Sequence, residues 1–241
     1  RQKLKLRAQS ITYFDGCFMK RILINALQAE ELRVAVVTGQ WLEDLDIEVP
    51  TRVQKKANIY KGYITRIEPS LEAAFIEYGG ERQGFLSFKE VARSYYRNPP
   101  AQGRANIRDV LYEGQELIIQ VDKDERDSKG AALTTYVSMA GRYTILMPNN
   151  PRSGGVSRRV EGEERAELRE IFQNLNVPEG MGAILRTAGR GRSLEELQAD
   201  IDEGIRIWNT IQTAANDYPA PVLLFQEGSL LVRTMRDYLR D

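Results

Sequence analysis

The chain has 241 residues with 34 basic and 34 acidic side chains, so its formal net charge is zero. It contains no histidine and a single cysteine, Cys17, which excludes His-based acid–base catalysis, Ser-His and Cys-His nucleophilic sites, most zinc sites and an internal disulfide. Catalysis by this chain alone would need carboxylates, Lys, Tyr or a carboxylate-bound metal, and the cysteine usage favours a reducing, cytoplasmic setting.

The first eighteen residues, RQKLKLRAQSITYFDGCF, open with a basic stretch. No continuous apolar segment and no small-residue cleavage site follows them, so we do not expect a secretory signal. Met19 begins the run MKRILINALQ, which reads as a natural start. We therefore assign residues 1–18 to an extension of unknown origin.

Before residue 50 the apolar pattern predicts three strands, at 21–25, 31–38 and 41–48. The last two flank Gly39-Gln40 and are expected to form a hairpin. In the third strand apolar residues alternate with acids, among them Asp44 and Asp46, which predicts one apolar and one acidic face. A solvated strand face explains this acidic row better than a divalent-cation site, because alternation alone accounts for it.

The segment from Asn58 to Phe88 combines short apolar runs, glycines and aromatic residues with interleaved Lys and Arg. Small barrels that hold single-stranded nucleic acid need these residue types, because glycines permit tight closure, rings stack on bases and cations follow the phosphates. Further strands at 116–123 and 130–138 bring the count in this region to five, as in an OB barrel. Two connecting elements are expected: a short helix at 89–96 and a Pro/Gly loop at 97–105.

From residue 142 onward strands and helices are mixed. The expected elements are a strand at 142–147, a loop at 148–155, a helix at 163–175, a strand at 181–187, a long helix after Ser193, a strand at 222–226 and a helix at 229–239. Ser193 and Glu196 have the spacing of a capping box, which marks the start of the long helix. The apolar stripe of that helix, from Leu194 to Ile211, is interpreted as core packing.

Two places in the chain are candidates for ligand binding. In the barrel, Phe75 and Phe85 fall in neighbouring strands near glycines, and Lys129 lies at the tip of a turn from which its cation could reach phosphate. The spacing leaves open whether the two rings lie in the barrel core or on its surface, because alternation does not say which face is inside.

The second candidate is the strand–loop–helix segment from Arg186 to Ser193. A glycine loop that leads into a helix N-terminus offers unpaired N–H groups, and arginines and the Thr187 hydroxyl add donors for a phosphate. Arg158-Arg159 would add positive charge if the fold brings them close. A plain connection with solvated arginines is slightly favoured by the motif alone, because GxGxxG and the P-loop signature are both absent.

Several runs together resemble the amino-terminal part of the ribonuclease E/G family. The resemblance covers the chain from Met19 to its end, with the motifs in nearly the same spacing throughout. QKKANIYKG and PSLEAAFIEYG are more similar to the ribonuclease E branch than to ribonuclease G. The runs that carry it are MKRILIN, QKKANIYKGYITRIEPSLEAAFIEYG, GAALTTYVS, LMPNNPRSGGVSRR, PEGMGAILRTAG and RDYLR.

The resemblance implies a mixed α+β, β-rich fold. A five-stranded OB-fold barrel is inserted, with an α+β sensor domain, into a split and here incomplete RNase H-like domain. The expected parts are the extension 1–18, a first RNase H-like segment at 19–53, an OB-fold RNA-binding domain at 54–135, a 5′-monophosphate sensor domain at 136–231 and the start of a second RNase H-like segment at 232–241.

The resemblance also implies site residues. Phe75, Phe85 and Lys129 correspond to family residues that contact RNA on the OB domain. The pocket for a 5′-monophosphate corresponds to Gly141, Ile145, Arg186 and Thr187. Ile145 replaces the valine expected there, a mild change for a backbone contact, and one further sensor arginine of the family is expected beyond this chain.

The family cuts single-stranded, AU-rich RNA in mRNA decay and in rRNA and tRNA maturation. Its two catalytic aspartates, which hold Mg²⁺, and its zinc-binding cysteine pair are expected downstream of residue 241. We therefore expect this chain to bind RNA with a 5′-monophosphate, to hold no cofactor and not to cleave by itself. The full-length protein is expected to need Mg²⁺ and Zn²⁺, and to act as a cytoplasmic homotetramer within an RNA-degrading complex at the inner membrane.

Two alternatives stay open. In the first, the chain is a non-catalytic RNA-binding or assembly module without end sensing, and both candidate pockets are structural. In the second, it is a carboxylate-metal nuclease that uses Asp44 and Asp46 with Asp122 or Asp124. The second is disfavoured because acids on the open face of a strand are usually solvated.

Overall fold

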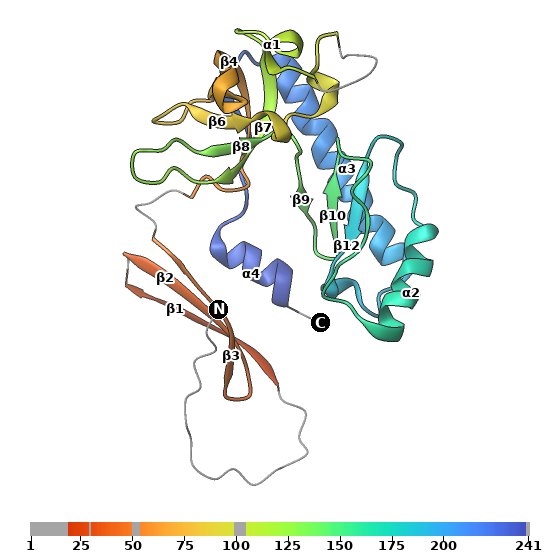
Figure 1. Cartoon of the computed structure of the whole chain (residues 1–241). Helices are drawn as coiled ribbons and strands as arrows, with labels where there is room; N and C mark the ends of the chain where they lie inside the picture. Colours follow the sequence, from red (N-terminus) through yellow and green to blue (C-terminus); the bar gives the residue numbers. More distant parts are fainter. Residues whose placement is uncertain (1–18, 29, 50–53, 99–104, 240–241) are drawn as a thin grey trace. The chain divides into compact units, whose positions relative to one another are not determined.

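The computed structural model describes residues 19–28, 30–49, 54–98 and 105–239. The chain divides into two compact units, residues 1–52 and residues 53–241 (Figure 1). The predicted extension 1–18 and most of the predicted Pro/Gly loop lie outside the described residues.

The first unit is a three-stranded antiparallel sheet in the order β1-β2-β3, formed by β1 (Lys20–Gln28), β2 (Glu31–Thr38) and β3 (Trp41–Glu48). The predicted hairpin between β2 and β3 is confirmed. Val34 and Val36 of the middle strand are buried, whereas Leu45 and Ile47 of β3 are 53% and 43% exposed. The apolar face of β3 is therefore largely open within the described residues of this unit.

The second unit contains a closed barrel of five strands: β4 (Ile59–Glu68), β5 (Ala73–Glu77), β6 (Gly84–Ser87), β7 (Glu116–Lys123) and β8 (Ala132–Thr134) (Figure 1). The strands follow the order β4-β5-β6-β8-β7, and antiparallel pairing of β4 with β7 closes the barrel. The predicted five-stranded, OB-like barrel and the mixed α+β, β-rich fold class are thus confirmed.

A strand from far along the chain joins the barrel at β4. β13 (Val222–Phe225) pairs antiparallel with the first residues of β4, with Leu223 opposite Tyr60. The same part of β4 pairs with β7, while its later residues pair with β5. The sequence predicts a strand here but not its partner, because period-two alternation does not identify which edge a strand joins.

The prediction of a helix at 89–96 is wrong. Two short 3₁₀ turns, η2 (Phe88–Glu90) and η3 (Arg93–Tyr95), lie on either side of an extended, buried Val91-Ala92. The amide of Ala92 donates to Thr135 Oγ1 over 2.6 Å, and the Thr135 amide donates to the Glu90 carbonyl over 2.9 Å. These tertiary hydrogen bonds replace the helical ones, and they also end β8 four residues before the strand predicted at 130–138 would end.

The rest of the second unit is a four-stranded sheet with helices. Its strand order is β11-β12-β10-β9, and β11 pairs with β12 in parallel. The strands are β9 (Met139–Ala140), β10 (Thr144–Met147), β11 (Gly155–Val156) and β12 (Gly182–Leu185). In the described part of the chain the helices are α1 (Ile107–Val110), α2 (Gly162–Gln173), α3 (Leu194–Asp217) and α4 (Leu230–Tyr238), and two further 3₁₀ turns are η1 (Pro69–Leu71) and η4 (Thr187–Gly189).

The predicted start of the long helix α3 is confirmed by its cap. The Ser193 amide donates to Glu196 Oε2 over 2.9 Å and the Glu196 amide donates to Ser193 Oγ over 3.3 Å, which completes a capping box. Residues of the predicted apolar stripe are buried in one core with β10 and β12, namely Leu197, Ile201, Trp208 and Ile211. Among the described residues no helix has both the length and the apolarity of a membrane span.

Candidate nucleic-acid interface

The structure resolves the orientation of the two barrel phenylalanines. Phe75 of β5 and Phe85 of β6 are directly opposite each other, and their rings meet edge to face with centroids 6.1 Å apart. Both are half-buried, whereas their strand neighbours Ala74, Ile76 and Leu86 are fully buried in the barrel core. Because successive strand residues point to opposite faces, the two rings lie on the outer face of the barrel.

A cation lies over this aromatic pair. Arg66 of β4 is the cross-strand partner of Phe75, and its Cζ lies 4.6 Å from the centroid of the Phe75 ring. Guanidinium over an aromatic face is a favourable cation–π arrangement. Arg66, Phe75 and Phe85 therefore form a row across three neighbouring strands, which we call the aromatic row. Arg66 is not among the predicted site residues, although its position on the strand preceding Phe75 was a usable signal.

Lys129 lies in a tight turn that packs against the segment leading into β6. Its amide and carbonyl exchange hydrogen bonds with those of Arg126, and its side chain is exposed. Arg82 Nη1 donates to the Asp127 carbonyl over 2.5 Å. A Cβ on Gly130 would lie only 2.0 Å from the Gln83 carbonyl oxygen, so only glycine permits this approach. The fold thus brings Lys129 to the strand that carries Phe85.

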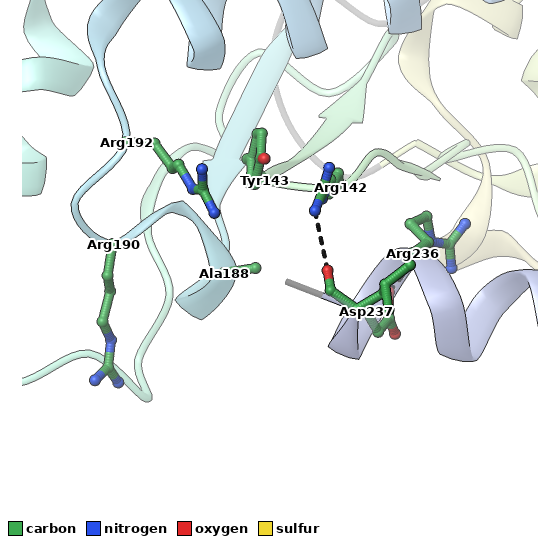
Figure 2. A pocket seen from close by; sticks show the side chains of 8 residues that line it. Arg142, Tyr143, Ala188, Arg190, Arg192, Arg236 and Asp237 are labelled. Carbon is green, nitrogen blue, oxygen red and sulfur yellow. Dashed lines mark hydrogen bonds and ion pairs between the residues drawn. The ribbon is translucent and has the colours of Figure 1, made fainter. Parts of the chain in front are cut away.

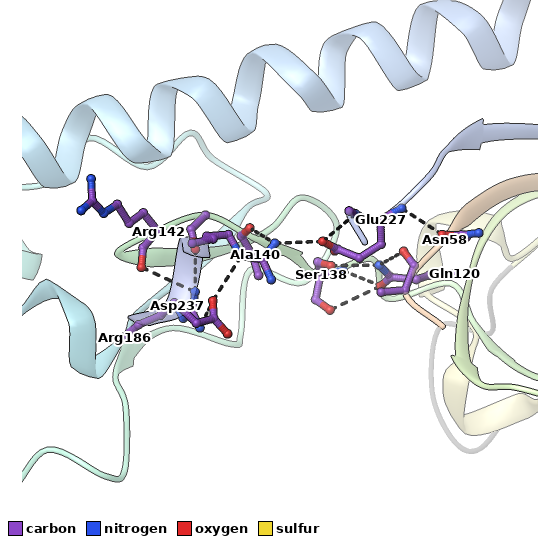
Figure 3. Close-up of polar contacts among 12 residues, drawn as sticks. Asn58, Gln120, Ser138, Ala140, Arg142, Arg186, Glu227 and Asp237 are labelled. Carbon is purple, nitrogen blue, oxygen red and sulfur yellow. Dashed lines mark hydrogen bonds and ion pairs between the residues drawn. The ribbon is translucent and has the colours of Figure 1, made fainter. Parts of the chain in front are cut away.

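Arg186, just after β12, is held at three places. Its amide donates to the Tyr143 carbonyl over 2.8 Å, and its Nη1 donates to the Gly141 carbonyl over 2.7 Å. Its Nη2 forms an ion pair with Asp237 Oδ1 of α4 at 2.8 Å (Figure 3). The side chain is 19% exposed, so this guanidinium is partly withdrawn from water but still reachable.

The four residues predicted for the phosphate pocket lie in β10 or within two residues of the ends of β9 and β12, and they make different contacts. Gly141 touches Arg186 directly, but its own amide donates to the Thr144 carbonyl over 2.9 Å. Thr187 is half-buried and begins η4 directly after Arg186. Ile145 is half-buried in β10, where it pairs with Ile184 and Ala140.

A carboxylate that is not among the predicted site residues shapes this region. Asp200 of α3 accepts three successive backbone amides, from Arg142, Tyr143 and Thr144, at 2.9, 3.1 and 2.8 Å. The Thr144 hydroxyl adds a fourth hydrogen bond of 2.6 Å. Successive N–H groups that converge on one anion form a nest. This nest is filled by the protein's own carboxylate, so these three amides are not available to a ligand.

A small pocket of about 40 Å³ is lined by Asp237, the ion-pair partner of Arg186, but not by Arg186 itself (Figure 2). Four arginines and one carboxylate line it, together with Tyr143, whose ring lies 5.3 Å from the Arg142 Cζ and 5.1 Å from the Arg192 Cζ. A space of this size holds about three waters, which is the scale of one phosphate group. The lining residues are Arg142, Tyr143, Ala188, Arg190, Arg192, Arg236, Asp237 and Leu239.

The arginines that follow Arg186 are partly neutralised. Arg190 pairs with Glu164 at 3.0 Å and Arg192 pairs with Glu196 at 3.2 Å. Arg158 and Arg159 are exposed just after β11, the strand parallel to β12, but they do not line the pocket.

A chain of polar contacts joins the barrel to Arg186 through α4 (Figure 3). The Glu227 amide donates to Asn58 Oδ1 over 2.9 Å, next to the start of β4. Arg236 contacts Glu227 Oε1 and the Ala140 carbonyl, both at 2.9 Å, and its Nε lies 3.2 Å from Asp237 Oδ1. The sequence offers no local signal for these contacts, since Glu227 and Asn58 lie 169 positions apart.

The acidic residues considered for a metal-dependent nuclease have ordinary surroundings. Asp44 and Asp46 each accept the amide of the following residue, and they belong to the first unit. In the second unit, Asp122 is exposed and Asp124 accepts the Lys55 amide. Within the described ranges, no three His, Cys, Asp or Glu side chains are grouped so as to hold a metal ion.

Comparison with known proteins places both candidate surfaces in defined sequence families. The S1 RNA binding domain profile matches residues 53–135, and the Ribonuclease E/G family profile matches residues 138–241. Ribonuclease E of Escherichia coli K12 and of Haemophilus influenzae are each 62% identical over 92% of this chain. The chain belongs to the ribonuclease E/G family. Ribonuclease G of Escherichia coli K12 is 32% identical over 90% of the chain.

The chain spans 21% and 24% of the two ribonuclease E proteins and 45% of ribonuclease G. The aromatic row and Lys129 lie in the region that matches the S1 RNA binding domain profile. Arg186 and the arginine-lined pocket lie in the region that matches the Ribonuclease E/G family profile.

Proposed function

We propose that this chain is the RNA-recognition part of a ribonuclease E-type endoribonuclease. It binds single-stranded, AU-rich RNA during mRNA decay and rRNA and tRNA processing, and it selects RNA with a 5′-monophosphate. The S1 match and the 62% identity to ribonuclease E support this function. The chain binds RNA without cleaving it, because the family's catalytic aspartates are expected in a later part of the protein.

The observation that carries the RNA-binding proposal is the outward-facing pair Phe75–Phe85. Two half-exposed rings on neighbouring strands, with a guanidinium over one of them, offer stacking surface to bases. Each base–aromatic stack contributes about 1–3 kcal/mol. Lys129 then contacts phosphate near the strand that carries Phe85.

The proposed 5′-phosphate site is the Arg186 guanidinium with the Thr187 hydroxyl and the neighbouring pocket. Arg186 is held by backbone carbonyls in a fixed orientation, which suits charge-assisted hydrogen bonds to a phosphate. The pocket beside it has room for about one phosphate group and an excess of arginine. Gly141 belongs to the proposed site because its carbonyl accepts from Arg186 Nη1, and Ile145 lies on the neighbouring strand β10.

Binding of the chain to a labelled single-stranded oligonucleotide, measured by fluorescence anisotropy, tests the barrel surface. Phe75→Ala and Phe85→Ala should each weaken binding by about tenfold. Tyr112→Ala is the matched control, because this ring is 47% exposed in the same unit but is not in the aromatic row. Equal losses from all three variants, or none, would overturn the proposed surface and leave a general electrostatic binder or an assembly module.

Matched oligonucleotides with a 5′-monophosphate or a 5′-hydroxyl test the end site. The wild-type chain should bind the monophosphate form more tightly, and Arg186→Ala should remove the difference while retaining binding through the barrel. Equal affinities of the wild-type chain for both ends would refute end recognition by this chain.

For the longer protein we propose Mg²⁺ for hydrolysis, Zn²⁺ between protomers and assembly as a homotetramer in an RNA-degrading complex at the inner membrane. The described part of this chain has no cluster of side chains that fits either ion.

A further inference from the structure

Asp237 pairs with Nη2 of Arg186, the nitrogen that takes part in both bidentate arrangements with a phosphate. A guanidinium donates two parallel hydrogen bonds along either of two edges, Nε with Nη2 or Nη1 with Nη2. Nη2 is common to both edges, and in this structure it pairs with Asp237 Oδ1 at 2.8 Å. Nη1 already donates to the Gly141 carbonyl. A phosphate that binds Arg186 bidentately must therefore displace Asp237 or share Nη2 with it.

The carboxylate has a second cation to which it can remain bound. Asp237 Oδ1 also lies 3.2 Å from Arg236 Nε, and Arg236 is itself anchored to Glu227 and to the Ala140 carbonyl. Releasing Arg186 therefore does not leave Asp237 without a partner, which keeps the cost of displacement low. Asp237 also lines the pocket beside Arg186, so the exchange takes place where the phosphate would enter (Figure 2).

We propose that Asp237 is a resident competitor of the terminal phosphate and sets the affinity of the Arg186 site. This inference rests on the proposed end recognition. A 5′-hydroxyl end brings no terminal phosphate to this site, so it does not compete with the carboxylate for the guanidinium. A terminal monophosphate carries about 1.5 to 2 negative charges at neutral pH, so it competes successfully for the same guanidinium.

The test is Asp237→Asn in the full 241-residue chain. The asparagine has nearly the same shape and can still accept a hydrogen bond from Nη2, but it removes the competing charge. Affinity for the 5′-monophosphate oligonucleotide should rise about two- to fivefold, the scale of a partly exposed ion pair. Affinity for the 5′-hydroxyl form should rise less, so the preference for the phosphorylated end increases.

Two variants separate competition from other effects. Asp237→Glu keeps the charge and should leave the preference near that of the wild type. Asp202→Asn makes the same charge change at an exposed position of α3, where the side chain contacts Gln198, and should not raise the preference. A gain common to Asp237→Asn and Asp202→Asn would show a general charge effect and overturn the proposal.

A loss of preference in Asp237→Asn, with an unchanged melting temperature, would show that Asp237 holds Arg186 for the ligand rather than competing with it. A different result would refute the proposed end recognition itself: the wild-type chain would then bind 5′-monophosphate and 5′-hydroxyl RNA equally well. If the wild type prefers the phosphate and Asp237→Asn shows the same preference, only the role of Asp237 is refuted.

Discussion

Gly141 lies directly against the carboxylate of Asp200: a Cβ at Gly141 would come within 2.4 Å of Asp200 Oδ2. The carboxylate cannot move away easily, because three backbone amides and a hydroxyl hold it in place. The need for glycine at this position thus follows from close packing. Through its carbonyl, the same residue fixes the guanidinium of Arg186.

Gly141→Ala should therefore change the geometry of the proposed phosphate site. Overpacking at such a contact costs about 1–3 kcal/mol of the free energy of unfolding, and the shifted loop would move the carbonyl that Arg186 contacts. We expect a lower melting temperature in calorimetry and a reduced preference for 5′-monophosphate RNA, while binding of 5′-hydroxyl RNA through the barrel is retained. An unchanged melting temperature would mean that Asp200 moves aside.

A second glycine controls the position of Lys129. Gly130→Ala would place a methyl group 2.0 Å from the Gln83 carbonyl oxygen, a backbone atom that cannot rotate away. The turn must then separate from the segment that enters β6. We expect weaker RNA binding than in the wild type even though Lys129 itself is intact, measured by anisotropy at low salt. Binding equal to that of the wild type would contradict the proposed contact of Lys129 with RNA.

Local patterns predict part of this architecture well. Alternation and turn residues predict the five barrel strands, the spacing of Ser193 and Glu196 predicts the start of α3, and its apolar stripe predicts the core beneath it. The helix expected at 89–96 fails because Thr135, some forty residues later, supplies hydrogen bonds that compete with helical ones. Local propensity gives no information about such a partner.

The candidate sites, like the fold, are only partly predictable from the sequence. Residue types and spacing single out Phe75, Phe85, Lys129 and Arg186, but only closure of the barrel decides that the rings face outward. The roles of Asp200 and Asp237 are not predicted, because each residue acts through contacts between its helix and a segment distant in the sequence. An acid on a predicted helix is most often solvated, so its sequence position alone favours the wrong interpretation.

Lys129 should contribute to the salt dependence of RNA binding. If its ammonium contacts one phosphate, Lys129→Gln lowers the slope of log K against log salt by about 0.7, the value for one contact on a single strand. Lys89→Gln, at an exposed lysine of η2, is the control and should leave the slope unchanged. A slope that is the same in wild type and Lys129→Gln would exclude a direct phosphate contact.

Glu125 should make the barrel sensitive to acid. Its burial raises the pKa of the carboxyl, but hydrogen bonds from the Tyr78 hydroxyl at 2.8 Å and Lys55 Nζ at 3.1 Å outweigh burial and hold the pKa below its ordinary value of 4.5. A carboxyl whose pKa is lowered by folding stabilises the protein above its ordinary pKa, and this stabilisation is lost as pH falls through the lowered value.

Glu125→Gln should therefore reduce the melting temperature most at pH 7, and the difference from the wild type should shrink as pH falls below about 4.5. Part of the loss at neutral pH arises because the buried Tyr78 hydroxyl loses a charged acceptor. Glu81→Gln, at an exposed loop position, is the control and should change the melting temperature little at any pH. A difference that is constant from pH 7 to pH 3 would contradict the role of the Glu125 charge.

Arg186→Lys separates charge from geometry at the end site. Lysine keeps the positive charge, but its single ammonium lacks the planar fork that donates to the Gly141 carbonyl and, along another edge, to an anion. We expect the preference for 5′-monophosphate over 5′-hydroxyl RNA to fall to a value between those of the wild type and Arg186→Ala, with RNA binding through the barrel retained. Arg206→Lys, at an exposed residue paired with Glu203 on α3, should keep the full preference. If Arg186→Lys also keeps the full preference, positive charge alone is sufficient, and the competition with Asp237 for Nη2 loses its geometric basis.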